Sequence, residues 1–519
     1  MIKYKSLREH CVSAMNSVVE YFKTTKGITQ AQRTQSFLFI LFLTVIFMLF
    51  SSFRTKNPDK NIKPNIVFIL ADDLGWRDAG FMGSKYYETP AIDKLAASGM
   101  VFTDGYANAP NCAPSRAALM TGLYGPRTGI YTVNSAKRGK DVYRRLIPVE
   151  NKIVLDSSFV TLAEVLKQNG YVSASVGKWH LGNPPHSGPI SQGFDINVGG
   201  WQLGHPKSYF SPYGNPYLTD GPKGEYLTDR LTREALRFIE ENKDRPFFLY
   251  FPHYAVHAPF QAKDSLKNQF INKPPDDGQK NPVYAAMIKS LDESVGRIIR
   301  KLDELHLRKN TIVVFMSDNG GVTFITSNTP LRGGKGMLYE GGIREPFIVS
   351  WPGKIKSGTV SPYPIIGTDM FPTLLHLTGS KPEKRLHFDG INLSKLLLKG
   401  KTPRKRALYW HFPAYLEQSR GIPGLWRTTP ASAIRYGNWK LIRFYETRKT
   451  ELYNLAEDIG EQNDLSLQNP KEKAKLEKMM DRWLRKTHAF IPTQKNPAFD
   501  PEKYQQRLKQ IKVQTYDKK

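Results

Sequence analysis

Four continuous apolar runs constrain the fold of this chain more than any other feature of its sequence. They cover residues 65–71, 171–176, 246–251 and 311–317, and segments with helical patterns separate them. A strand that is apolar on both faces has to be covered on both faces, which is typical of strands in a parallel sheet. The runs therefore predict an α/β fold in which helices sandwich a mostly parallel central sheet.

Polar side chains follow directly after each of the four runs. In open α/β sheets, ligands bind outside the carboxyl ends of the strands. Because these ends share one edge of a sheet, we expect the polar side chains to converge on a single site. In chain order they are Asp72, Asp73, Lys178, His180, His253, His257, Asp318 and Asn319.

The composition changes at a basic, proline-containing linker that begins at Lys401. Beyond it, short segments alternate between polar and apolar residues, as antiparallel strands do, and a basic helical pattern follows at 471–486. We therefore expect a larger α/β domain at 64–400 and a smaller α+β subdomain with an antiparallel sheet at 401–491. The basic tail, 492–519, is expected to pack poorly.

An almost wholly apolar segment, residues 37–53, follows the positively charged residues 1–36 and precedes a polar linker at 54–63. Its length is at the short end for a membrane span. Positive charge before the segment predicts a cytoplasmic N-terminus and an exported remainder, which is periplasmic, membrane-anchored or secreted. We favour a signal-anchor over a cleaved signal peptide, although translation from Met15 would favour cleavage.

The chain holds two cysteines, Cys11 and Cys112, and a formal net charge of +28. Two cysteines on opposite sides of the apolar segment cannot build a disulfide framework in the exported part. The charge concentrates anionic partners. No zinc-finger, RNA-recognition or basic-zipper pattern is present, so no nucleic acid is expected, and a sulfated polysaccharide fits the charge equally well.

Two pairs of oxygen donors, Asp72 with Asp73 and Asp318 with Asn319, each follow a predicted buried strand. Such donors are the ligands of a hard divalent cation, calcium or magnesium. Zinc or iron would require more nitrogen or sulfur ligands. The sequence therefore predicts a calcium or magnesium site at this edge of the sheet.

Residues 112–122 read Cys-Ala-Pro-Ser-Arg-Ala-Ala-Leu-Met-Thr-Gly. This segment resembles the signature of the type I, formylglycine-dependent sulfatases of the alkaline-phosphatase-like superfamily. The resemblance extends over about residues 65–465 and is greatest to bacterial glycan sulfatases. Further matching segments, in the family's order, are residues 65–73, 177–182, 255–259, 317–321, 331–336, 339–346 and 451–455.

The resemblance implies a role for each matching residue. Cys112 would be oxidised to formylglycine by a formylglycine-generating or radical maturation enzyme, and the aldehyde hydrate would attack sulfur. Arg116 would orient this nucleophile, while Lys178 and Lys335 would contact the sulfate group. One calcium ion would be held by Asp72, Asp73, Cys112, Asp318 and Asn319.

Two histidines would move protons in the family's reaction. His257 would protonate the departing alcohol oxygen, and His180 would take a proton from the sulfated hydrate so that the aldehyde re-forms. Further candidates for substrate contact lie near the site or in the second domain. They are Trp201, His205, Lys207, His253 and His411, with a structural hydrogen bond as the alternative for His253 and domain-interface packing for His411.

The sequence thus predicts an exported sulfatase that hydrolyses sulfate esters of a carbohydrate. Segments 208–215 and 224–229 resemble bacterial enzymes that act on sulfated galactose or galactosamine glycans. Two alternatives stay open. One is a formylglycine-dependent phosphodiester or phosphonate hydrolase, and the other is a non-catalytic polyanion-binding protein with the same fold. The expected partners are the sulfated carbohydrate, the maturation enzyme and, through residues 37–53 if uncleaved, the membrane.

Overall fold

The computed structural model describes residues 63–516 except 421 and 423, together with residues 20, 24, 27, 29 and 30. The predicted apolar segment at 37–53 lies outside the described residues. Among the described helices, none combines the length and apolar character needed to cross a membrane. From Lys63 onward the chain forms one compact unit.

A nine-stranded sheet forms the centre of this unit, with strand order β4-β3-β5-β1-β6-β7-β2-β8 and with β9 beside β2. The four predicted runs form the adjacent parallel strands β3, β5, β1 and β6. Strand β7 alone runs in the opposite direction, antiparallel to both of its neighbours, β6 and β2. The bounds are β1 Asn65–Ala71, β2 Met100–Tyr106, β3 Val172–Val176, β4 Ile196–Val198, β5 Phe247–Pro252, β6 Thr311–Ser317, β7 Arg344–Ser350, β8 Thr359–Ser361 and β9 Ile365–Ile366.

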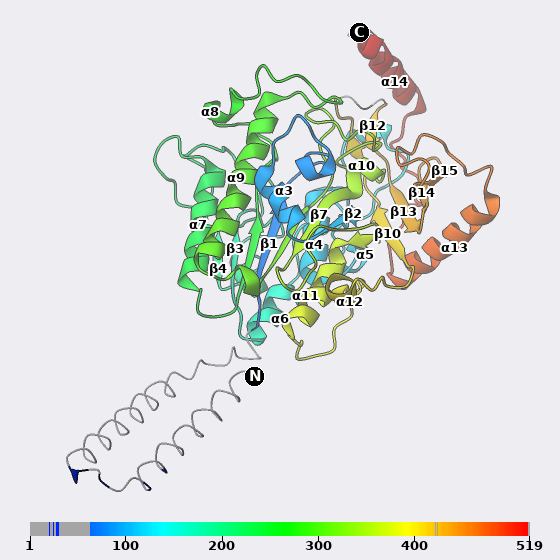
Figure 1. Ribbon diagram of the computed structural model, residues 1–519. Coiled ribbons are helices and arrows are strands. Elements are labelled where there is room, and N and C mark those ends of the chain that lie inside the picture. Colours follow the sequence, from blue (N-terminus) through cyan, green and yellow to red (C-terminus); the bar gives the residue numbers. More distant parts are fainter. Residues whose placement is uncertain are drawn as a thin grey trace. The chain divides into compact units, whose positions relative to one another are not determined.

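Helices cover both faces of this sheet. Successive side chains of a strand point to opposite faces, so the wholly apolar strands present apolar side chains on both faces, and both must be covered. Val67 and Ile69 of β1 belong to a core shared with α3, α7 and α9, whereas Ile66 and Phe68 belong to a core shared with α4, α6, α11 and α12. Figure 1 shows α7 and α9 together on one side of the strands. The bounds are α3 Pro90–Ala97, α4 Cys112–Thr121, α6 Leu162–Gln168, α7 Leu227–Glu241, α9 Pro282–Glu304, α11 Met370–Thr378 and α12 Ser394–Lys399. The predicted α/β sandwich is confirmed.

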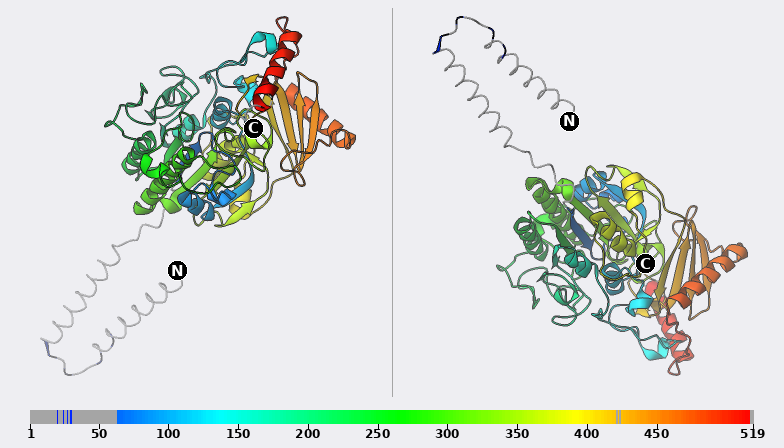
Figure 2. Two further views of the ribbon diagram at one scale, coloured as in Figure 1. Left: turned by 90° about the horizontal axis from the view of Figure 1, so that it is seen from above. Right: turned by 90° about the horizontal axis from the view of Figure 1, so that it is seen from below.

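The C-terminal part carries an antiparallel sheet in the order β10-β13-β14-β15, as expected. Helix α13 packs against this sheet, as the views in Figure 2 show. A separate hairpin, β11 with β12, leaves it and reaches the candidate site described below. The bounds are β10 Ala407–Phe412, β11 Leu416–Glu417, β12 Trp426–Thr428, β13 Ala431–Tyr436, β14 Trp439–Phe444, β15 Thr450–Asn454 and α13 Pro470–Lys486.

The tail forms helix α14 (Pro501–Tyr516) and contacts residues 141–147, although most of its described residues are exposed, as expected of a poorly packed segment. The Asp500 amide donates to the Val142 carbonyl at 3.0 Å. The Arg145 guanidinium lies over the rings of Phe499 and Tyr504, at 5.3 and 5.2 Å from their centroids. Such contacts leave no periodic apolar pattern in the sequence. The remaining short helices are α5 Gly125–Thr128, α8 Asp264–Lys267 and α10 Glu340–Ile343.

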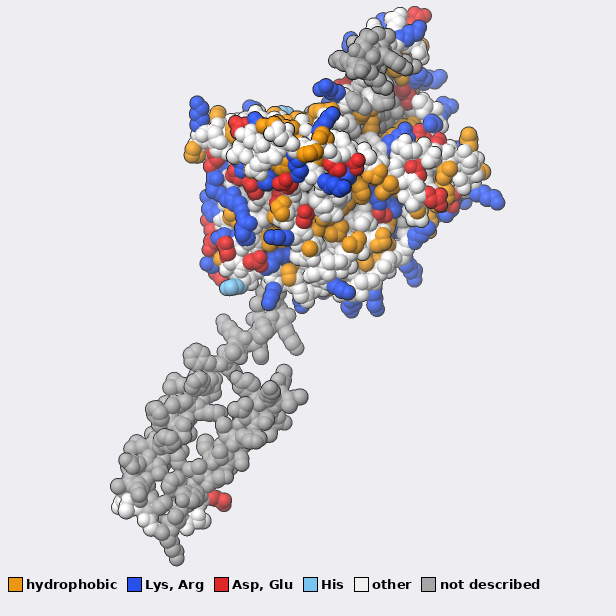
Figure 3. All heavy atoms as spheres, turned by 45° about the horizontal axis from the view of Figure 1, so that its top comes forward, with side chains coloured by type: hydrophobic (Ala, Val, Ile, Leu, Met, Phe, Trp, Pro, Cys, Tyr) orange, Lys and Arg blue, Asp and Glu red, His pale blue; other side chains and the backbone are white. Residues whose placement is uncertain are grey.

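The positive charge of the chain does not gather in one place on the face that Figure 3 shows. There, Lys and Arg side chains are interspersed with Asp and Glu side chains. Recognition of an anionic ligand on this face therefore depends on local groups of cations rather than on one extended basic surface.

Candidate active site

Strands β1 and β6 bring the two predicted pairs of oxygen donors together. Ala71 is in register with Ser317, so Asp72 and Asp73 leave the sheet beside Asp318 and Asn319. The Asp73 amide donates to Asp318 Oδ1 at 3.3 Å, and Asn319 Nδ2 donates to Asp73 Oδ1 at 2.8 Å. None of the four residues is more than 3% exposed.

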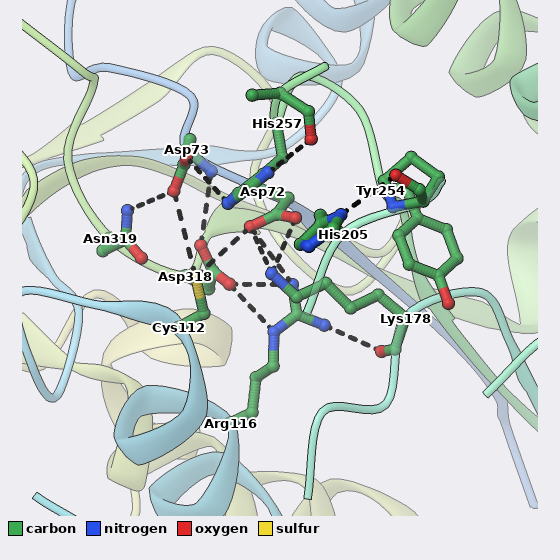
Figure 4. A network of polar contacts seen from close by, with 12 residues as sticks. Asp72, Asp73, Cys112, Arg116, Lys178, His205, Tyr254, His257, Asp318 and Asn319 are labelled. Carbon is green, nitrogen blue, oxygen red and sulfur yellow. Dashed lines mark hydrogen bonds and ion pairs between the residues drawn. The ribbon is translucent and has the colours of Figure 1, made fainter. Parts of the chain in front are cut away.

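Each of the three carboxylates contacts a cation, and Figure 4 shows two of these cations, Lys178 and Arg116. Lys178, which follows β3, donates to both carboxylate oxygens of Asp72 at 2.8 Å. Arg116, in the second turn of α4, holds Asp318 at 2.7 Å, and Lys335 holds Asp73 at 2.7 Å. These six charged residues, Asp72, Asp73, Arg116, Lys178, Asp318 and Lys335, are called the floor cluster below.

Cys112 is the first residue of α4 and lies directly on the floor cluster. Its Sγ is 3.6 Å from Asp72 Oδ1 and 3.4 Å from Lys335 Nζ, and the residue is 1% exposed. Burial raises the pKa of the thiol to about 12, although Lys178 and Lys335 act in the opposite direction. Because a thiolate is the reactive form of cysteine, unmodified Cys112 is a weak nucleophile at neutral pH.

The donors around Cys112 fit a hard cation. Ligand atoms of Asp72, Asp73, Cys112 and His257 all lie within 4.8 Å of one another. The Oδ1 atom of Asn319 is buried without a hydrogen-bond partner among the described residues, which leaves an acceptor available to a cation. Burial raises the pKa of Asp72 to about 7 against the effect of Lys178. Lys178 therefore offsets the burial of Asp72 only in part, whereas at Asp73 the effects of Lys335 and His257 outweigh burial and lower the pKa.

Asp318 is outside this group of four, although the sequence predicts it as a ligand. Its carboxylate accepts from Arg116 Nε at 2.8 Å and from the Asp73 amide. The structure therefore places Asp318 between the predicted metal ligands and Arg116, in contact with both.

Two histidines face the floor cluster. His257 Nδ1 is 2.7 Å from the Ala258 carbonyl, which can only accept, so Nδ1 carries a proton and Nε2 points to Asp73 Oδ2 at 3.6 Å. The Nδ1 atom of His180 has no hydrogen-bond partner among the described residues. Burial lowers the pKa of both rings well below the ordinary value, and Lys335 lowers that of His257 further, as Lys178 does for His180. Burial and the nearby lysines therefore both favour the neutral form of these two rings.

The backbone is strained at two of these residues. Asp73 has φ 64° and His180 has φ 63°, in the left-handed region that non-glycine residues seldom occupy. Such strain persists only where the surrounding structure enforces it, and it concentrates at functional sites. Here it directs the Asp73 carboxylate toward Lys335 and the His180 ring toward Gly204.

A cavity of about 530 Å³ opens above the floor cluster. Asp73, Cys112, His180, His257 and Lys335 line it, whereas Asp72, Arg116, Lys178, Asp318 and Asn319 lie beneath. From the loop after β4, Trp201 and His205 also line the cavity. The His205 ring stacks on the His257 ring, with 6.2 Å between their centroids.

Three predicted substrate contacts do not line this cavity: Lys207, His253 and His411. His411 is 2.6 Å from Ser432 Oγ and 3.0 Å from the Phe490 carbonyl, inside the C-terminal part. His253 is fully buried against Phe251, and neither ring nitrogen has a hydrogen-bond partner among the described residues.

Sequence reasoning missed several residues that line the cavity. Arg138 precedes the tail-binding segment, Arg427 lies on β12, and Phe260 and Phe324 belong to loops. The two arginines are not distinguishable by pattern among 75 lysines and arginines. No motif surrounds them, and only the fold brings them to the cavity.

Comparison with known proteins agrees with this geometry. A family model described as "Sulfatase" matches residues 64–380, and one described as "N-sulphoglucosamine sulphohydrolase, C-terminal" matches residues 334–489. A sulfatase of Formosa agariphila is 34% identical, over 87% of this chain and 94% of its own. The N-acetylgalactosamine-6-sulfatase of Mus musculus is 38% identical, over 67% of this chain and 68% of its own.

A solved structure shows the same likeness. The crystal structure of Ps i-CgsB in complex with k-i-k-neocarrahexaose has a TM-score of 0.68 and 34% identity, over 81% of this chain and 92% of that one. Fold and site together define a sulfuric ester hydrolase with an alkaline-phosphatase-like fold. The chain belongs to the sulfatase family, and the resemblance seen in its motifs is confirmed.

Proposed function

We propose that this sulfatase hydrolyses sulfate esters of a carbohydrate of the galactose or N-acetylgalactosamine type. The observation that carries the proposal is the cavity above Cys112, whose floor presents Lys335, His180 and His257 to one bound group. The proposal is supported by relatives named for N-acetylgalactosamine 6-sulfate and by the neighbour bound to a neocarrahexaose.

In the active protein, residue 112 is formylglycine, made from Cys112 by a formylglycine-generating or radical maturation enzyme. This group supplies a geminal diol, which combines a nucleophilic hydroxyl with a second hydroxyl that allows sulfate to be released. The neutral thiol of Cys112 supports this proposal, because it makes an unmodified cysteine a weak nucleophile.

One calcium ion is the proposed cofactor. The residues that hold it are residue 112, Asp72, Asp73, Asp318 and Asn319, and the unpartnered Oδ1 atom of Asn319 supports this assignment. When bound, the ion supplies positive charge where negative charge accumulates on the sulfuryl oxygens. Lys335 and Lys178 supply further fixed positive charge at the same place.

His257 is the proposed general acid toward the leaving alcohol. Its Nδ1 proton is held by the Ala258 carbonyl, so only Nε2 is free to exchange a proton with a ligand. A bound sulfate group offsets the charge of Lys335 and raises the pKa of His257, which favours the protonated acid on the substrate complex. His180, whose Nδ1 has no partner among the described residues, is the proposed base of the second step.

Mass spectrometry of the tryptic peptide 95–116 tests the proposal together with an activity assay. We expect the mass of the aldehyde at residue 112 and turnover of a sulfated galactose or N-acetylgalactosamine. Removal of divalent cations by a chelator should abolish turnover, and calcium should restore it. Faster hydrolysis of an aryl phosphodiester than of an aryl sulfate would overturn the assignment in favour of phosphodiester chemistry.

Export is proposed on the sequence of residues 1–53 alone. We propose that the part from Lys63 onward works outside the cytoplasm, tethered to the membrane through 37–53 or released from it. Cell fractionation checks this placement: the protein should accompany the membrane or the periplasm. Recovery in the cytoplasm of cells that export normally would refute it.

A further inference from the structure

Two arginines that no motif marks stand together at the wall of the catalytic cavity. Arg138 and Arg427 both line it, and Arg427 reaches it on the β11–β12 hairpin of the C-terminal part. The Arg427 side chain lies over Gly336, the residue after Lys335. A Cβ atom at Gly336 would be 2.9 Å from Arg427 Cδ, so the missing side chain gives Arg427 its place.

The charges of these two arginines are not balanced. Arg138 Nε is 3.0 Å from Glu417 Oε2. Arg427 makes no ion pair within the described part of the chain, and its buried Nε has no hydrogen-bond partner there. Only one of the two guanidinium groups thus has a carboxylate partner. In the floor cluster, by contrast, every cation contacts its own carboxylate.

The pKa of Arg427 also indicates that its positive charge is not fully compensated. Burial lowers the pKa of Arg427, and the positive charge of Arg138 lowers it further, against Asp73 and Glu417. A buried polar group without a partner costs free energy, and a second positive charge nearby adds to this cost. An anion placed between the two guanidinium groups removes both penalties, so the pair is prepared for an anionic ligand.

We propose that Arg138 and Arg427 bind a second anionic group of the glycan, a sulfate ester or a uronate carboxylate, outside the position of the sulfate that is cleaved. This inference rests on the proposed function and deepens it, because it makes a multiply charged glycan the preferred substrate. A guanidinium group binds either anion through two parallel hydrogen bonds.

The shape of the molecule beyond Arg427 leaves room for such a glycan. Arg427 also lines an adjoining cavity of about 410 Å³, together with Arg332, Trp426 and Phe444. A sugar chain that enters the catalytic cavity can therefore continue past Arg427 along the C-terminal part. Arg332 donates hydrogen bonds to the Tyr453 hydroxyl and to the Glu461 carbonyl, whereas the buried Nε of Arg427 has no hydrogen-bond partner among the described residues.

The two anions on the substrate differ in what they do during the reaction. Charge develops on the sulfate that is cleaved, whereas the second anionic group keeps its charge throughout. Interactions with a group that does not change stabilise the bound substrate and the transition state equally. Loss of Arg427 should therefore raise KM and leave kcat nearly unchanged.

The experiment compares wild type with Arg427→Gln on four substrates. These are 4-nitrophenyl sulfate, a neutral disaccharide with one sulfate, a disaccharide with two sulfates, and a sulfated disaccharide with a uronate. We expect KM to rise about 10- to 100-fold on a substrate with two anionic groups, the effect of losing a charged hydrogen bond. The two substrates with one anionic group should change less than about twofold.

Arg420→Gln is the matched control, because Arg420 is exposed in the same hairpin and lines none of these cavities. It should leave all four substrates unchanged. A loss confined to the disulfated or to the uronate substrate supports the proposal and identifies the anionic group. Equal losses on all four, or none on the substrates with two anionic groups, would overturn it.

Calorimetric binding of the disulfated and the uronate disaccharides adds a readout that needs no turnover. Arg427→Gln should weaken binding of the preferred disaccharide by the same factor as it raises KM. If the wild type binds that disaccharide through Arg427 yet hydrolyses no sulfate ester, the proposed function fails and the binding site stands. If binding of both disaccharides is independent of Arg427, the binding site fails whatever the enzyme hydrolyses.

Discussion

Two regions of this protein each bury three carboxylates and three cations, but the two groups of charges have different surroundings and different roles. The floor cluster holds three carboxylates and three cations beneath the cavity. A second group, the junction cluster, holds three of each where the central sheet meets the C-terminal sheet. Its members are Asp104, Glu340, Arg344, Arg435, Lys440 and Glu461.

The junction cluster is closed. Lys440 is fully buried and contacts Glu340 and Glu461, each at 2.9 Å. The hydroxyl of Tyr106 donates to Glu340 at 2.7 Å. Tyr106 itself belongs to the apolar core of the C-terminal part, so these charges join two sheets, and they line neither the catalytic cavity nor the cavity that adjoins it at Arg427.

The floor cluster has the same number of charges but lies open to a cavity on one side. Lys335 is 14% exposed, Asn319 Oδ1 has no partner among the described residues, and Asp73 has a left-handed backbone. Net charge therefore does not separate a structural ion cluster from a functional one. A left-handed backbone does not separate them either, because Glu461 of the junction cluster has φ 52°. Access does, because Asp73 and Lys335 of the floor cluster line the catalytic cavity, where a ligand can reach them.

The largest expected effect tests whether the floor cluster serves chemistry rather than folding. Cys112→Ser should lower kcat about 10⁴- to 10⁶-fold, as loss of a nucleophile does, if the expression host does not convert serine. Thermal unfolding and substrate binding should remain close to wild type. Steady-state kinetics measures kcat, and calorimetry measures thermal unfolding and substrate binding. Wild-type turnover from an unconverted serine would contradict the mechanism.

His257→Gln sharpens the comparison within the floor region. Turnover of a sugar sulfate should fall about 10²- to 10⁴-fold, because a sugar alcohol needs a proton to leave. Turnover of 4-nitrophenyl sulfate, whose leaving group needs none, should change little. The ratio of kcat values on the two substrates is the measurement, and an equal loss on both would remove His257 from the role of general acid.

Lys440→Met breaks the junction cluster instead. It leaves Glu340 and Glu461 without their shared cation, so the free energy of unfolding should fall by about 3–5 kcal/mol. Lys449→Met is the control, because Lys449 is 58% exposed beside Glu451, and it should cost about 1 kcal/mol or less. Denaturant unfolding measures both values. The turnover of folded Lys440→Met protein should match wild type, and a selective loss of turnover would make the junction cluster part of the site.

The smallest expected effect concerns His253, a buried titratable residue outside both clusters. Burial lowers the pKa of His253 to about 3. The unfolded chain therefore binds a proton near the ordinary pKa of about 6.5 that the folded chain excludes, and stability is lost as the pH falls through that value. Wild type should lose about 2 kcal/mol more than His253→Leu between pH 7 and pH 5. Denaturant unfolding at the two pH values measures it, and equal losses would show that His253 is protonated or partnered in the folded protein.

Much of the fold was predictable from local pattern. The runs at 65–71 and 311–317 are buried on both faces, and both form central parallel strands. Asp72, Asp73, Asp318 and Asn319 converge because they leave neighbouring strands in register. The contacts of the tail were not predictable, because they depend on Arg145 lying over two aromatic rings rather than on a periodic apolar face.

Some properties of the site depended on distances that no sequence pattern contains. Lys178 was expected at the sulfate, and the structure places it beneath the cavity on the Asp72 carboxylate. His411 was a candidate for the cleft, whereas Arg427 and Leu416 from the neighbouring hairpin line it instead. Each outcome follows from packing between segments far apart in the chain.

By itself, the sequence determined the sulfatase family, the sandwiched parallel sheet and the chemical groups around Cys112. These depend on short motifs and on strand ends, where neighbours along the chain set the geometry. Only the tertiary structure decided which charges are closed into the junction cluster, which lie open at the floor, and that Arg427 stands beside Arg138 without a carboxylate of its own. The reason is that burial and pairing of charge depend on what packs around each group, and a linear sequence does not contain that information.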